Sequence, residues 1–126
     1  MSTDRTYRLG DLQLKIMKVL WAARSATVAE VQQQLDGEQL AYTTVATMLR
    51  KMEDRGLVRH RQKQRKFIYE PAVSEQQVTR SMADDLVDRL FQGSLTETVC
   101  HLLQSREVSH EELDRLEQFI RDRKQQ

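Results

Sequence analysis

The stretch from Ala41 to Pro71 constrains the fold more than any other part of this sequence. Its first half carries apolar residues three or four positions apart, which predicts a helix over about 42–55. Gly56 stands where a glycine ends a helix, and two runs rich in β-type residues follow it. A short basic tip, residues 62–66, separates these runs, so we expect a β-hairpin that Pro71 closes. The tip lacks an Asn-Gly pair, which leaves its turn type open.

Two further helices are expected before this unit. Apolar residues recur at helical spacing over 9–23, which predicts a mostly buried helix. β-branched residues within 25–28 predict a very short strand. Thr27 with Glu30 three positions later matches a capping box, the pattern that begins a helix, and this helix should run to Leu35.

The rest of the chain is expected to be helical. Ser74 and Ser109 each begin the capping pattern Ser-x-x-Glu/Gln. We expect one helix from Ser74 to about Gly93, a short one over 96–104 and a last one over 110–124. The fold class is therefore mainly α with a small β-hairpin, as a winged helix-turn-helix followed by a C-terminal α-helical dimerisation domain.

Charge separates the same two parts. Residues 1–73 hold 13 lysines and arginines against 8 acids, and residues 74–126 hold 7 against 11, although the whole chain is only +1. We therefore expect a winged-helix DNA-binding domain over 1–73 and a helical dimerisation domain over 74–126.

Dimerisation follows from the amphipathic tail. Three such helices cannot all bury their apolar stripes on one small domain, and a second copy of the chain offers a matching surface. The residues assigned to this interface are Val78, Met82, Leu86, Leu90, Val99, Leu103, Leu113, Leu116, Phe119 and Ile120.

The third helix suits entry into a major groove. Its apolar stripe, expected to face inward, is Tyr42, Val45, Leu49 and Met52. The opposite face has short or hydroxyl side chains at its start, which let the backbone approach base edges, and bases further on. This face holds Thr43, Thr47 and Arg50, flanked by Thr44, Ala46 and Lys51.

Positive charge continues into the hairpin. The stretch from Arg50 to Lys66 holds eight bases against two acids. Such side chains supply affinity for phosphates but little sequence information. The expected phosphate contacts are Arg50, Lys51, Arg61, Lys63, Arg65 and Lys66.

Other functions find less support. A winged helix that binds a protein partner, with the acidic tail assembling a complex, is the alternative from a different class. We find no nucleophile elbow, phosphate-binding glycine loop or metalloprotease motif, and no Cys/His spacing of a metal site, so we expect no enzyme, cofactor or metal. Cys100 is expected to be a buried structural thiol. Trp21, Phe67 and Tyr69 are expected in the core rather than on a stacking surface.

The environment is expected to be the cytoplasm. A single cysteine excludes an intrachain disulfide, and the polar amino terminus does not resemble a signal peptide. No apolar run is long enough to insert into a membrane.

The motifs resemble those of the penicillinase-repressor family, the BlaI/MecI/CopY type of bacterial repressor. The similarity rests on the segments LGDLQLKIMKVLW, ATVAEVQQQL, AYTTVATMLRKMEDRGLV, KFIYEP, SLTETVCHLL and SHEELDRLEQFI. The resemblance covers nearly the whole chain. It implies a homodimeric repressor that binds inverted-repeat (palindromic) operators in double-stranded DNA and blocks transcription.

The resemblance also implies roles for single residues. Residues that match the family's base contacts are Thr43, Thr44, Ala46 and Thr47. Resistance repressors of the family have basic residues at the positions of Thr43 and Ala46, so the resemblance implies the groove-binding role but leaves the operator sequence open. A membrane sensor-protease triggers cleavage of those repressors at an Asn-Phe bond. The matching pair here is His101-Leu102, so that bond is missing, which leaves cleavage at another bond or a different inducer open. Copper-sensing relatives carry four cysteines, which one Cys100 cannot reproduce.

Overall fold

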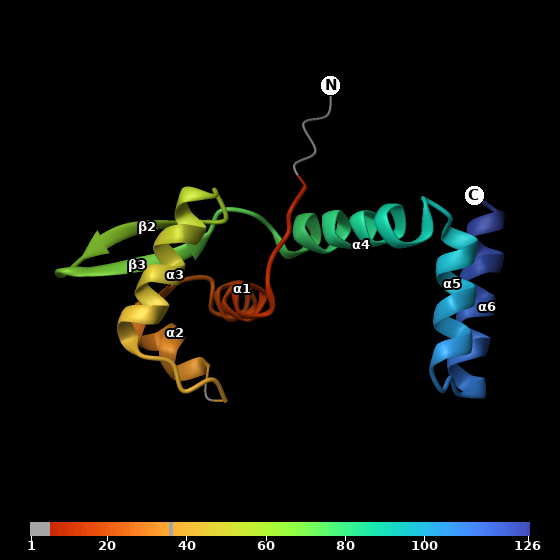
Figure 1. The fold of residues 1–126 in the computed structure, drawn as a ribbon, viewed down its shortest axis with the longest axis horizontal. Coiled ribbons are helices and arrows are strands. Elements are labelled where there is room, and N and C mark those ends of the chain that lie inside the picture. The colour runs from red at the N-terminus through yellow and green to blue at the C-terminus, as the bar shows by residue number, and fades with distance from the viewer. Residues whose placement is uncertain (1–5, 36) are drawn as a thin grey trace, which may run out of the picture. The chain divides into compact units, whose positions relative to one another are not determined.

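The computed structural model describes residues 6–35 and 37–126, and its elements follow the predicted order (Figure 1). The elements are α1 (Asp11–Ala23), β1 (Ala26–Thr27), α2 (Val28–Gln34), α3 (Tyr42–Asp54), β2 (Val58–Lys63), β3 (Lys66–Pro71), α4 (Glu75–Phe91), α5 (Leu95–Ser105) and α6 (His110–Lys124). The chain divides into two compact units, Met1–Ala83 and Asp84–Gln126. The expected fold class is confirmed, because the protein is mostly helical with one small antiparallel sheet.

The sheet has the strand order β1-β3-β2. β1 adds only two residues, which pair with Ile68 and Tyr69 of β3. β2 and β3 form the predicted hairpin, and its last cross-strand pair is Lys63 with Lys66. The two residues between them, Gln64 and Arg65, have φ angles of 52° and 68°. Positive φ at both central positions defines a type I′ turn, which twists in the same sense as the strands.

The glycine after α3 ends this helix as predicted. Gly56 has a φ of 79°, and its N–H donates to the carbonyl of Glu53 at 2.9 Å. The N–H of Leu57 donates to the carbonyl of Met52 at 3.0 Å, and both side chains are buried. This pair of hydrogen bonds is a Schellman motif. It sends the chain directly from α3 into β2, so the hairpin begins beside the end of the helix.

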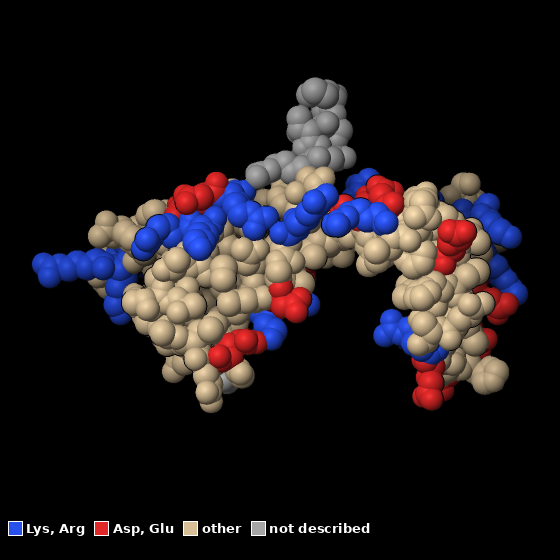
Figure 2. All heavy atoms as spheres, in the orientation of Figure 1, with Lys and Arg blue, Asp and Glu red and all other residues tan. Residues whose placement is uncertain are grey.

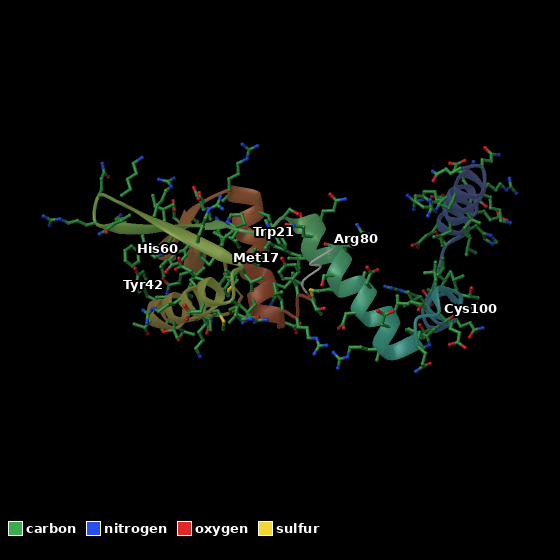
Figure 3. All side chains as sticks on the ribbon, turned by 90° about the horizontal axis from the view of Figure 1, so that it is seen from above. Met17, Trp21, Tyr42, His60, Arg80 and Cys100 are labelled. Carbon is green, nitrogen blue, oxygen red and sulfur yellow. The ribbon has the colours of Figure 1, made fainter. Side chains whose placement is uncertain are left out.

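The core of the first unit gathers apolar side chains from α1, α2, α3, the sheet and the start of α4. Met17 and Trp21 both come from α1 (Figure 3). Met17 is fully buried, whereas Trp21 is only partly buried and packs against the core. The fully buried members are Ile16, Met17, Leu20, Val31, Val45, Leu49, Met52, Leu57, Val58 and Val78.

Two aromatic residues expected in this core lie outside it. Tyr42 is 52% exposed, because it occupies the first position of α3, beyond the buried stripe that begins at Val45. Phe67 is 47% exposed, because it lies on the hairpin beyond the residues that β1 covers. Tyr69, two positions along the same strand, is buried as expected.

The first turns of α4 belong to the first unit. The predicted capping box is present, since the Ser74 N–H donates to Gln77 Oε1 at 2.8 Å and the Gln77 N–H donates to Ser74 Oγ at 3.1 Å. Val78 is buried in the core and Met82 packs against it. The assignment of Val78 to a dimer interface is therefore wrong, because its own chain already covers it. Met82 is likewise partly covered by this core.

The second unit leaves its apolar side chains largely uncovered. Ser94 and Ser109 cap α5 and α6 by accepting hydrogen bonds from the N–H groups of Glu97 and Glu112, each at 3.1 Å. Within Asp84–Gln126, every residue of which is described, Thr98 is the one buried residue. Cys100 is exposed in the single chain, so the expectation of a buried thiol is wrong there.

Candidate nucleic-acid interface

The buried stripe of α3 fixes which side of this helix faces outward. Val45, Leu49 and Met52 have no exposed surface, and they lie three or four positions apart on one side. The opposite side is exposed at three threonines, and Ala46 on its flank is half-buried. A shallow hollow runs along this surface. It is lined by Thr43, Thr44, Thr47, Met48 and Lys51.

Exposed cations adjoin this threonine surface. Arg50 and Lys51 continue it along α3. The hairpin adds four more exposed basic side chains from the predicted set, and Figure 2 shows Lys and Arg gathered at its end. These are Arg61, Lys63, Arg65 and Lys66. The structure thus brings the predicted phosphate-contact residues into the same compact unit as the threonines, on α3 and on the hairpin beside it.

One acid lies among the cations of the hairpin. The Nε–H of Arg59 donates to Glu70 Oε1 at 2.8 Å, and Arg61 Nε lies 4.0 Å from the other carboxylate oxygen. This hydrogen bond from Arg59, together with the nearby charges of Arg59 and Arg61, holds the pKa of Glu70 below its ordinary value. Arg59 is therefore paired with an acid of the neighbouring strand within the sheet.

A histidine links the hairpin to α3. The Nδ1 of His60 on β2 lies 2.7 Å and 2.8 Å from the two carboxylate oxygens of Glu53 on α3. Sequence reasoning tested the histidines only for the spacing of a metal site and did not predict this pair. The sequence feature that could have indicated this pair is Gly56, because a tight turn there brings residues on either side of it close together.

A second contact missed by sequence reasoning lies at the end of α3. The guanidinium of Arg55 donates to Gln13 Oε1 at 3.0 Å and to the carbonyl of Arg8 at 2.9 Å. Arg55 thereby holds the segment before α1 against the end of α3. Both bonds join residues more than forty positions apart, so no local pattern could predict them.

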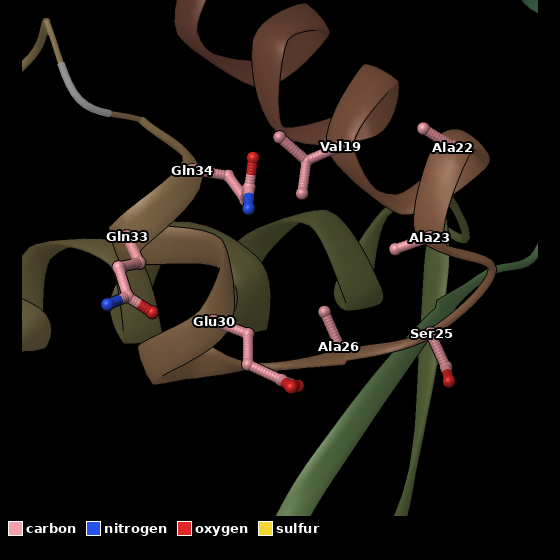
Figure 4. A pocket seen from close by; sticks show the side chains of 8 residues that line it. All are labelled: Val19, Ala22, Ala23, Ser25, Ala26, Glu30, Gln33 and Gln34. Atoms are coloured by element: carbon pink, nitrogen blue, oxygen red, sulfur yellow. The ribbon is translucent and has the colours of Figure 1, made fainter.

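The hollow drawn in Figure 4 is unrelated to this surface. It measures about 410 Å³ and is lined by α1, by α2 and by the residues between them, with none from α3. The Glu30 carboxylate in its wall already accepts the Thr27 N–H at 2.8 Å in the capping box of α2. Three of its eight lining residues are alanines, which offer a ligand no polar contact through their side chains.

Two further features are absent from residues 6–35 and 37–126. This part of the chain contains no cluster of three His, Cys, Asp or Glu side chains that could hold a metal ion. It also contains no helix with the length and apolar character needed to cross a bilayer.

The two residues matched to a cleaved bond lie inside α5. His101 and Leu102 are both exposed helical residues. The ring of His101 lies 5.5 Å from that of Phe91, at the end of α4. This pair therefore lies within regular helix rather than in a loop.

The sequence profile of the penicillinase repressor family matches residues 9–122. The chain belongs to the penicillinase repressor family. It is 27% identical to the penicillinase repressor of Bacillus licheniformis over 118 residues, which cover 93% of this chain and 92% of that protein. It is 30% identical over 116 residues to the transcriptional regulator BlaI of Mycobacterium tuberculosis, with 90% of this chain and 83% of that protein covered.

The structural comparison agrees with the family. The solution structure of the DNA-binding domain of the repressor BlaI matches with a TM-score of 0.51 and 28% identity, over 60% of this chain and 93% of that domain. The present member of the penicillinase repressor family is thus a winged-helix, DNA-binding transcriptional repressor and not an enzyme. This outcome favours the repressor over the protein–protein adaptor.

Proposed function

We propose that this family member is a homodimeric repressor that places α3 in the major groove of an inverted-repeat operator and its hairpin against the phosphate backbone. The observation that carries the proposal is the exposed threonine face of α3 beside the basic hairpin. In a winged helix this combination matches the two contacts that DNA requires, one with base edges and one with phosphates.

The roles of single residues follow from side-chain size and charge. Thr43, Thr44, Ala46 and Thr47 would approach the bases, since hydroxyls can hydrogen-bond to base edges and methyl groups can touch thymine. Arg50 and Lys51 with the four basic residues of the hairpin would meet phosphates. The absence of long basic side chains at Thr43 and Ala46 makes the expected base contacts short.

Dimerisation is supported by the apolar side chains that the second unit leaves exposed. A unit of this size cannot bury enough surface to be stable alone, and exposed apolar patches mark association sites. A two-fold pair would present two copies of α3, which is why the operator is proposed to be an inverted repeat. The exposed residues are Leu86, Leu90, Leu95, Val99, Leu102, Leu103, Leu113, Leu116, Phe119 and Ile120. We propose 74–126 as the dimerisation domain and 1–73 as the DNA-binding domain, although the first turns of α4 pack on the core of the first unit.

Release from DNA would follow an inducing signal in the cytoplasm. A membrane sensor-protease that triggers cleavage is the candidate partner, by similarity to resistance repressors. The candidate bond joins His101 to Leu102, and Leu102 is one of the apolar side chains that are exposed in the single chain and proposed to pair in the dimer. Because both lie within α5, the helix would have to open locally before the peptide bond between them could enter a protease.

Salt-dependent binding tests the placement of the hairpin on phosphates. Changing Lys63 and Lys66 together to Ala should lower the slope of log affinity against log salt by about 2, since each lost phosphate contact removes about 0.9. The probe is a mixed-sequence duplex, followed by fluorescence anisotropy at several salt concentrations. The matched control changes Arg106 and Arg115 to Ala, which removes the same charge from the second unit.

The outcomes separate the two classes of function. An unchanged slope in the Lys63/Lys66 variant would refute the hairpin contact. A wild-type protein without salt-sensitive duplex binding would refute the repressor proposal altogether. Selecting genomic fragments with the purified wild type would then provide the operator sequence for the specific measurements.

A further inference from the structure

We propose that Glu53 and His60 are positioning residues for DNA binding, whose contact holds the hairpin at the angle to α3 from which its cations reach the phosphates. The inference rests on the proposed function, because it assumes that the hairpin meets the phosphate backbone. It assigns a role to an acid on the DNA-binding helix, where an acid would otherwise only weaken affinity.

The contact is a direct bridge between the two elements that DNA would touch. A carboxylate can only accept hydrogen bonds, so the Nδ1 of His60 carries the proton and donates it. This nitrogen is 2.7 Å and 2.8 Å from the two oxygens of Glu53. Because Glu53 lies in the last turn of α3 and His60 in the middle of β2, the bridge spans the turn at Gly56. Figure 3 labels His60 on the hairpin and Tyr42 on α3.

Two aromatic rings hold the imidazole in place. The ring of His60 lies 4.5 Å from that of Phe67 and 5.6 Å from that of Tyr69, with interplanar angles of 42° and 46°. His60 is the cross-strand partner of Tyr69, and Phe67 pairs with Gln62 two positions further out. Since alternate residues of a strand share a face, all three rings lie on the same face of the hairpin. Phe67, half exposed, therefore packs on the histidine instead of entering the core.

The outer hairpin depends on this bridge because little else supports it. β1 covers only Ile68 and Tyr69 on β3, so the residues beyond them form a two-stranded ribbon. A two-stranded hairpin is at best marginally stable by itself in water. The proposed phosphate contacts Lys63, Arg65 and Lys66 all lie on this ribbon. Its direction is therefore set where it leaves the sheet, which is the position of His60.

The inference predicts opposite effects on duplex affinity for substitutions of two neighbouring acids. Glu53 and Asp54 are adjacent acids on α3, and either carboxylate should repel DNA phosphates. If Glu53 acts only through its charge, Glu53→Ala and Asp54→Ala should both tighten duplex binding. If Glu53 positions the hairpin, Asp54→Ala should tighten binding and Glu53→Ala should weaken it about tenfold, the scale of one lost charged hydrogen bond. The salt slope of Glu53→Ala should fall as well, because fewer phosphates are reached.

Conservative variants distinguish positioning from a general loss of fold. Glu53→Gln keeps an acceptor without the charge, so it should restore wild-type affinity or exceed it. His60→Asn keeps a donor near the place of Nδ1 and should bind more tightly than His60→Ala. In the double variant Glu53→Ala with His60→Ala, the loss should be no larger than in either single variant, because both remove the same link. Each protein is measured as the full chain, with the same mixed-sequence duplex, and thermal unfolding is recorded beside binding.

Each result either supports or overturns the inference. The inference would be overturned if Glu53→Ala bound the duplex as tightly as Asp54→Ala, or if the losses of affinity were additive in the double variant. In either case, duplex binding by the wild type would leave the proposed function intact. If Glu53→Ala fails to fold, His60→Ala and His60→Asn are compared instead. Equal duplex affinities of these two variants would overturn the inference. Wild-type protein that does not bind the duplex would overturn the proposed function and, with it, this inference.

Discussion

The indole Nε1–H of Trp21 donates a hydrogen bond of 2.9 Å to the carbonyl oxygen of Val73, 52 positions along the chain. This bond ties α1 to the segment between the sheet and α4. The side chain of Val73 is itself buried in the core. The helix that leads out of the DNA-binding unit therefore starts from a point fixed on α1.

Replacing this tryptophan by phenylalanine tests the strength of the tie. Trp21→Phe keeps an aromatic ring but leaves the partly buried carbonyl without its donor, so the free energy of unfolding should fall by about 1–2 kcal/mol. Urea denaturation followed by far-UV circular dichroism measures this change. Tryptophan fluorescence cannot follow the unfolding of this variant, because Trp21 is the only tryptophan in the sequence. Unchanged stability would show that water replaces the indole without cost.

Local patterns predicted the helices and their ends well. The caps at Thr27, Ser74 and Ser109 and the stop at Gly56 were all readable, because capping depends on residues within one turn of the helix end. Each predicted helix ends within about two residues of the observed boundary, which is the ordinary uncertainty of such assignments. The cap at Ser94 was missed although SLTE carries the same Ser-x-x-Glu pattern.

Burial was harder to predict, since it depends on which partner covers a stripe. Tyr42 continues the apolar spacing of α3 but extends past the core, and Phe67 packs on His60 instead. Along α4 a single apolar stripe runs through the boundary between the two units. Periodicity cannot tell that Val78 contributes to the first core while Leu90 is left exposed. Periodicity could not predict the Glu53–His60 bridge either, because this contact depends on the geometry of the turn between helix and strand.

The hairpin turn is built from residues that disfavour its geometry. Gln64 and Arg65 both have positive φ, a region that costs an ordinary residue roughly 1–2 kcal/mol and costs Asn less. We expect Gln64→Asn to raise the free energy of unfolding by about 0.5–1 kcal/mol without changing DNA affinity. The control is Gln62→Asn, the same change on β2, where Asn is disfavoured and should stabilise nothing. Equal effects of the two changes in urea denaturation would contradict this account of the turn.

The threonine face of α3 is open to a substitution that alters charge and leaves the fold alone. Thr47 is exposed, so Thr47→Glu should fold normally but place a carboxylate against the bases and phosphates. Binding to a selected operator should become undetectable by gel shift under conditions that saturate the wild type. Thr79→Glu is the matched control, an exposed threonine on α4, and it should bind operator like the wild type. If Thr47→Glu still bound the operator, the DNA bases would have to contact a different surface of the protein.

The last prediction concerns the partner that covers α6. Leu116 is 40% exposed in the single chain and belongs to the proposed dimer interface, so Leu116→Asp would bury a carboxylate there. Burying a charge without a partner is costly, and the dimer should dissociate at concentrations where the wild type stays paired. Operator affinity should fall at the same time, because two linked copies of α3 bind one inverted repeat more tightly than separate copies do.

Its control lies two positions away on the same helix. Gln118→Asp adds the same charge at an exposed residue outside the apolar stripe, where the side chain donates to Asp122 at 2.9 Å. Sedimentation velocity should find this variant dimeric and Leu116→Asp monomeric, with both retaining helical circular dichroism. If the Leu116→Asp protein remained dimeric, the dimer interface would have to lie away from α6. The exposed side chains of Phe119 and Ile120 would then need a different partner.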